Sequence, residues 1–75
     1  MKIVTPFEVA DLNTELMQAG VSCRVHLTDA CGAQSFWLEA EEDQLDAAHA
    51  VIVAFFERKG AKPQFDKAGT YFTLQ

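Results

Sequence analysis

Apolar and polar positions along this chain repeat first with a helical period and then with a strand period. Val9, Leu12 and Leu16 recur at the spacing of one helix face. The Thr-Pro-Phe-Glu segment at 5–8 is a capping box with proline at the first helical position, and a glycine follows the apolar stripe. We therefore predict a helix over residues 6–19.

Strict alternation then predicts two strands joined by a turn. Residues 21–27 place valine, cysteine and leucine on one face, and serine, arginine and histidine on the other. Residues 28–33 contain the aspartate and glycine that turns favour, and residues 34–39 alternate again. The pattern predicts a hairpin with one apolar face.

The second half of the chain repeats this order. An acidic stretch ends at Asp43, which we take as the N-cap of a second helix, and the apolar stripe that follows ends at Gly60. Residues 61–66 and 70–74 then predict two short strands around a glycine turn. Pro63 favours an edge strand or an early strand position for the first of them, because proline cannot donate to a ladder.

The predicted fold class is α+β. The order αββαββ favours a four-stranded antiparallel sheet with two helices packed on one face. Residues 1–75 are a single domain in this interpretation, made of two tandem αββ units at about 1–40 and 41–75. The helices would cover the apolar strand residues Val21, Cys23, Val25, Leu27, Phe36, Leu38, Phe65, Phe72 and Leu74. The open face would carry Arg24, His26, Trp37, Gln64, Tyr71 and Thr73.

Composition narrows the class of partner. The 75 residues include eleven acidic and six basic side chains, a net charge of −5. An acidic domain gains nothing from counterion release at a phosphate backbone or from an anionic lipid surface, so we expect neither nucleic acid nor a membrane as partner. The N-terminus lacks an apolar signal segment, so we expect a cytoplasmic protein with reduced thiols. The sequence predicts no cofactor.

Cys31 is the first candidate for chemistry. In the predicted turn its thiol would lie near His26, which as a base would lower the thiol pKa and produce a nucleophile or a redox sensor. Asp29 would raise that pKa, so a small residue that packs the turn is the competing interpretation. A zinc site is not predicted, because Cys23 and His26 point to opposite faces of a strand.

The second candidate is a binding surface on the open sheet face. The alternation that buries Phe36 sends Trp37 outward, where Tyr71, Arg24 and His26 join it. Exposed Trp and Tyr beside an Arg are typical of interface hot spots. The second predicted helix also has a wider apolar surface than one sheet face needs, which favours association. A protein partner and self-association fit these observations equally.

The run from His26 to Trp37, HLTDACGAQSFW, resembles the signature of the RDAC family of small bacterial proteins, mostly from anaerobic Firmicutes. The similarity extends to the start of the first helix and departs where Thr28 replaces the arginine of the family name. The resemblance implies a bacterial, cytoplasmic protein and does not indicate any particular activity. It directs attention to a motif loop made of Asp29, Ala30, Cys31, Gly32 and Gln34. Folding alone would explain Asp29 as a cap of turn amides and Gly32 as a residue of positive φ.

We therefore expect a non-enzymatic protein-interaction or regulatory module that binds another protein or a second copy of itself. This interpretation depends on exposed aromatic residues without a catalytic constellation. The alternative is a thiol-dependent enzyme or redox switch centred on Cys31, with His26 and Asp29 as the other catalytic candidates.

Overall fold

The computed structural model describes residues 3–30 and 32–75, and helix α1, Pro6–Gln18, is its first element. Both bonds of the capping box are present, since Glu8 N–H donates to Thr5 Oγ1 (3.2 Å) and Thr5 N–H donates to Glu8 Oε1 (3.0 Å). Val4 and Val9 flank this cap and are both buried, as in a hydrophobic staple. The helix therefore begins where the sequence predicts and with a fixed entry angle.

A Schellman motif ends α1 and sets the start of the first strand. Val21 N–H donates to Leu16 O (3.0 Å), and Gly20 adopts a φ of 75° between them. Because Val21 is held by the helix end, strand β1 spans Cys23–Ala30 and begins two residues later than predicted.

The first hairpin is longer than its sequence suggests. Strand β2 spans Ala33–Ala40, and its ladder with β1 continues to the pairs Asp29↔Gln34 and Ala30↔Ala33. The predicted turn over 28–33 is therefore wrong in extent, and Asp29, Ala30 and Gln34 lie in strands rather than in a loop. Cross-strand pairing outweighs the turn preference of aspartate here.

The second helix starts through a tighter turn. A 3-10 helix at Glu42–Gln44 precedes α2, Leu45–Glu57. Asp43 lies inside this turn, so its predicted role as N-cap is wrong. The N-cap residue is Gln44, whose Oε1 accepts from Ser22 N–H (3.1 Å) and so links the two halves of the chain.

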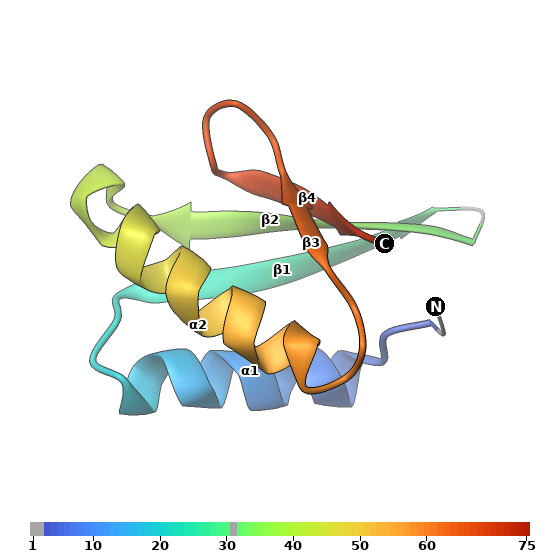
Figure 1. Cartoon of the computed structure of the whole chain (residues 1–75), viewed down its shortest axis with the longest axis horizontal. Helices are drawn as coiled ribbons and strands as arrows, with labels where there is room; N and C mark the ends of the chain where they lie inside the picture. Colours follow the sequence, from blue (N-terminus) through green and yellow to red (C-terminus); the bar gives the residue numbers. More distant parts are fainter. Residues whose placement is uncertain (1–2, 31) are drawn as a thin grey trace.

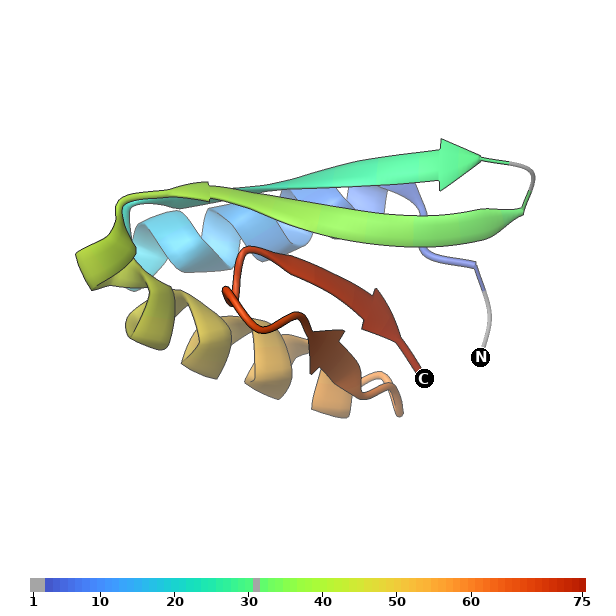
Figure 2. The ribbon, with the colours of Figure 1, turned by 90° about the horizontal axis from the view of Figure 1, so that it is seen from above.

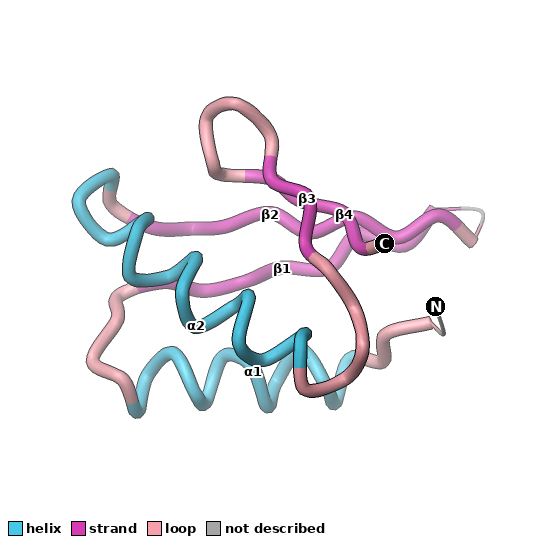
Figure 3. The backbone as a smooth tube through the Cα atoms, in the orientation of Figure 1, coloured by secondary structure: helices cyan, strands magenta, loops and turns pink. Residues whose placement is uncertain are grey.

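The sheet confirms the predicted α+β class. Strands β3, Pro63–Phe65, and β4, Tyr71–Leu74, complete an antiparallel sheet in the order β1-β2-β4-β3 (Figure 1), with Pro63 on an edge strand as predicted. Both helices lie on one side of this sheet (Figure 3), and the view from above shows that the β1–β2 hairpin extends beyond β4 (Figure 2).

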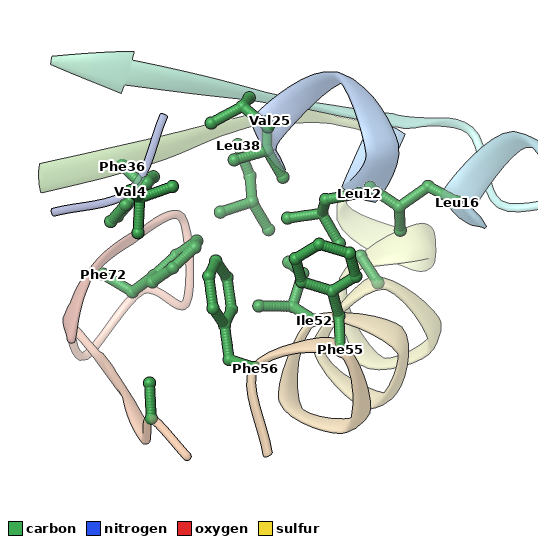
Figure 4. Close-up of a cluster of buried hydrophobic side chains, with 13 residues drawn as sticks. Val4, Leu12, Leu16, Val25, Phe36, Leu38, Ile52, Phe55, Phe56 and Phe72 are labelled. Atoms are coloured by element: carbon green, nitrogen blue, oxygen red, sulfur yellow. The ribbon is translucent and has the colours of Figure 1, made fainter. Parts of the chain in front are cut away.

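The core lies between the sheet and the helices. Phe36, Phe56 and Phe72 are nearly inaccessible to solvent, and the Phe36 and Phe72 rings stack with centroids 4.7 Å apart (Figure 4). The strand residues predicted to face the helices all belong to this core or pack against it: Val21, Cys23, Val25, Leu27, Phe36, Leu38, Phe65, Phe72 and Leu74. Strand alternation therefore predicts the inside and outside of the sheet correctly.

His49 of α2 closes the turn between β3 and β4. Its Nε2 donates to Gly69 O (2.6 Å), and its ring packs on Phe65 with centroids 4.1 Å apart. Gly69 has a φ of 76°, and a Cβ at this position would lie 2.7 Å from the imidazole. Glycine is therefore required here both by conformation and by space.

Candidate functional site

A row of three rings crosses the sheet face opposite the helices. The register places His26 of β1 beside Trp37 of β2, and Trp37 beside Tyr71 of β4. Trp37 is 41% exposed and Tyr71 is 43% exposed, although Phe36 and Phe72, their sequence neighbours, are buried. The structure thus brings together three of the four predicted binding residues in adjacent strands, and we name His26, Trp37 and Tyr71 the aromatic row.

Side-chain contacts hold the aromatic row in place. The rings of His26 and Trp37 stack with centroids 4.1 Å apart and planes 15° apart. His26 Nε2 lies 2.9 Å from Glu39 Oε1, and the Tyr71 hydroxyl donates to Ser35 Oγ (2.7 Å). Each ring therefore has a defined orientation before any partner arrives, which lowers the entropy cost of binding.

The charges on this face are unevenly paired. Arg24 and Glu39 are direct cross-strand partners of opposite sign, an arrangement that usually gives an ion pair. Glu39 instead contacts His26, and Arg24 makes no hydrogen bond or ion pair with any of residues 3–30 or 32–75. The fourth predicted binding residue is thus a guanidinium without an intramolecular partner in this part of the chain.

The candidate thiol site is not brought together by the residues that the structure describes. Cys31 lies outside them. His26 contacts Glu39, which is on the side away from the hairpin turn, and Asp29 Oδ2 accepts from Gln34 Nε2 (3.2 Å). The two proposed partners of the thiol therefore have other contacts, and a catalytic or redox role for Cys31 stays a prediction.

Two residues of the motif have a clear role in folding. Gln34 Nε2 donates to Val4 O (2.8 Å) and Gln34 Oε1 accepts from Val4 N–H (2.9 Å), so one amide satisfies both backbone groups of a buried residue. Asp29 holds the Gln34 amide from the neighbouring strand. We call these three residues the Gln34 clamp. Gly32 has a φ of 81°, so folding alone accounts for three motif positions, Asp29, Gly32 and Gln34, without any ligand.

Cys23 is half-buried on the helix side of β1, and burial raises the pKa of its thiol. A raised pKa disfavours the reactive thiolate. Within the described ranges no group of three or more His, Cys, Asp or Glu side chains could hold a metal ion.

Helix surfaces differ from the expectation. The apolar surface of α2 is broader than one sheet face needs, as predicted, but Ile52, Phe55 and Phe56 are buried against α1 and the sheet, so this surface gives no support for association. Of the two helices it is α1 that carries large exposed apolar side chains, since Phe7 is 83% and Met17 is 71% exposed. At 100° per residue, Phe7 lies about 200° around the helix from the buried Val9, on the opposite side. A helical wheel drawn from the sequence could therefore have predicted that Phe7 is exposed.

No protein-family model, curated protein or solved structure matches this chain. Its resemblance to the RDAC family therefore remains a prediction. Neither helix in the described part of the chain is long and apolar enough to cross a membrane.

Proposed function

We propose that this protein is a non-enzymatic protein-interaction or regulatory module whose ligand surface is the aromatic row on the open sheet face. The observation that supports the proposal is a pair of exposed rings, Trp37 and Tyr71, held in fixed orientations by neighbouring side chains. Large rings that are already ordered bury much apolar area at low entropy cost, and they dominate interface energies.

The charge distribution favours a protein as the partner. The chain carries a net charge of −5, but the strand positions around the aromatic row are mostly uncharged: Thr28, Ser35, Gln64 and Thr73. Interface cores are depleted of charged residues, whereas nucleic acid and anionic lipid require basic ones. We further propose a cytoplasmic setting, where thiols such as Cys23 stay reduced. The partner is another protein or a second copy of this chain.

Trp37 provides its own assay, because it is the only tryptophan in the chain. Self-association through the aromatic row should shift its fluorescence to shorter wavelength as concentration rises, together with a doubling of mass in sedimentation equilibrium. Tyr71→Ala should reduce both effects. Phe7→Ala is the matched control, because it removes an exposed ring from α1 and should change neither.

A different protein partner is tested by photo-crosslinking in the cells of origin. A benzoylphenylalanine at Thr73, beside the aromatic row, should give a discrete adduct, whereas the same group at Lys67 in the β3–β4 turn should not. Equal adducts from both positions contradict the proposal. So does a protein that stays monomeric, with unchanged Trp37 fluorescence, and gives no adduct.

A further inference from the structure

Strand β1 is an edge of the sheet, and only part of that edge is closed. Asn13 of α1 accepts from Val25 N–H (2.7 Å) and donates to Val25 O (3.0 Å), which shows that the backbone of Val25 points away from β2. Because backbone directions alternate along a strand, Leu27 and Asp29 point their N–H and C=O groups to the same outer side. None of residues 3–30 or 32–75 bonds to these four groups.

A groove runs along this edge between β1 and α1. It consists of two adjoining hollows of about 610 and 530 Å³ that share Asn13 and Arg24 in their walls. Both volumes lie in the range of sites that bind ligands. The hollow beside Leu27 has apolar walls made of Pro6, Val9 and Ala10. It therefore suits an apolar side chain presented next to the free edge.

Arg24 provides the groove with a cation, and Glu39, which lines one of the two hollows, contacts His26. The Arg24 side chain borders both hollows and has no partner in the described part of the chain, because Glu39 contacts His26 instead. A guanidinium binds a carboxylate through two parallel hydrogen bonds, which gives direction as well as attraction. The groove thus combines unpaired backbone, an apolar hollow and a cation.

We propose that the edge from Leu27 to Asp29 accepts an extended segment of another protein as a fifth strand. This is β-augmentation, in which backbone bonds give affinity and alternate side chains give specificity. The partner residue opposite Leu27 places an apolar side chain in the hollow beside Pro6. The segment leaves the ladder before Val25, whose edge groups bond to Asn13, and a carboxylate three positions from the apolar residue reaches the Arg24 guanidinium on the other face of the sheet.

The geometry argues against a second copy as the occupant. The antiparallel register that uses both free residues pairs Leu27 with Asp29 of the second copy. In that register the strand of the second copy ends at Ala30, opposite His26, where its hairpin turns back, so it places no carboxylate opposite Arg24. The register centred on Leu27 would pair Asp29 with Val25, whose backbone already bonds to Asn13. The register centred on Asp29 sets two carboxylates side by side.

Selection from a random decapeptide library on phage tests the proposal with the whole chain as target. Peptides bound by the wild type should carry Asp or Glu three positions from an apolar residue. The same selection on Arg24→Glu should enrich Lys or Arg at the acidic position. Lys67→Glu makes the same charge change in the distant β3–β4 turn and should select the wild-type pattern.

Two further variants separate the backbone from the side chain at the edge. Asp29→Pro removes the outward N–H, and Asp29→Ala keeps it while removing the same carboxylate. A selected peptide should bind Asp29→Pro about tenfold or more weakly than Asp29→Ala, since one bond and the local strand fit are lost.

The proposal is overturned if no peptides are enriched, or if Arg24→Glu selects acidic peptides as the wild type does. Equal binding by Asp29→Pro and Asp29→Ala, or a second copy that displaces the peptide from this edge, overturns it as well. The readout is a peptide at the edge of β1, so this experiment and the Trp37 assay of the open face can fail independently.

Discussion

The Gln34 clamp predicts a large loss of stability from one surface-edge substitution. Gln34→Ala removes both bonds to Val4, a residue that is only 4% exposed. Each unsatisfied buried backbone group costs roughly 1–3 kcal/mol, so losing the partner of two such groups should lower the free energy of unfolding by roughly 2–6 kcal/mol. A domain of this size has roughly 4–11 kcal/mol in total at 0.05–0.15 kcal/mol per residue, so the loss is a large fraction.

Two variants identify the mechanism of that loss. Asp29→Ala leaves both Val4 bonds in place and removes only an exposed 3.2 Å contact, so it should cost about 0.5 kcal/mol. In the Gln34→Ala background the same change should cost nothing, because its partner is gone. Gln34→Glu keeps the size but cannot donate to Val4 O at neutral pH, and it brings a second carboxylate close to Asp29. It should destabilise nearly as much as Gln34→Ala.

Urea denaturation followed by far-UV circular dichroism measures these differences, and melting curves provide a second readout. Gln34→Ala should melt roughly 10 °C or more below the wild type, since about 1 kcal/mol corresponds to 4–8 °C at this chain length. The reasoning is refuted if Gln34→Ala lies within about 0.5 kcal/mol of the wild type, a margin typical of ordinary surface changes. Strict additivity of Gln34→Ala and Asp29→Ala would also refute it.

Three further predictions concern other parts of the fold. Gly60 has the same φ as Gly69, and a Cβ at Gly60 would contact no other atom, so Gly60→Ala should lower the free energy of unfolding by about 1–2 kcal/mol. Gly69→Ala should lower it by at least twice as much, because its Cβ would also clash with His49. Equal losses in urea denaturation would show that the contact with His49 is unimportant. Asn13→Ala opens the edge of β1, so it should lower the free energy of unfolding by roughly 1–2 kcal/mol in urea denaturation and increase aggregation measured by light scattering. Unchanged stability and aggregation would contradict this role of Asn13. Burial raises the pKa of Cys23 above its ordinary value of 9.0, so its contribution to stability is complete below that pH and declines as the pH rises further. Cys23→Ala should therefore reduce the alkaline loss of stability, and a curve that stays parallel to the wild type would exclude this cause.

Much of the fold follows from local signals in the sequence. The capping box and the apolar stripe predict α1, and strand alternation predicts which side chains face the helices. These signals act between residues that are near in sequence, or through the simple rule that apolar faces meet. The same alternation predicts that Trp37 and Tyr71 are exposed on one face, although only the strand register shows that they are neighbours.

The remaining features depend on contacts between residues that are distant in sequence. Gln34 and Val4 are 30 positions apart, and Asn13 and Val25 are 12 apart, so no periodicity indicates either pair. The contact of Glu39 with His26 rather than with Arg24 is a choice between two near partners, which pattern alone does not decide. The Arg24 guanidinium, which has no partner among residues 3–30 and 32–75, and the groove beside it therefore become visible only in three dimensions.

The contrast between closed and open backbone along the sheet connects folding with binding. Amide side chains satisfy Val25 and Val4, and an imidazole satisfies Gly69, so this chain uses polar side chains to complete backbone groups that no strand reaches. An unpaired edge invites aggregation, and natural proteins usually protect it. Among the residues that the structure describes, that protection stops on β1 after Val25, where an apolar hollow adjoins the strand and Arg24 has no partner. A partner strand would bond to the outward N–H and C=O groups of Leu27, as Asn13 bonds to those of Val25 two residues earlier. The three-residue interval between Arg24 and Leu27 would set its specificity.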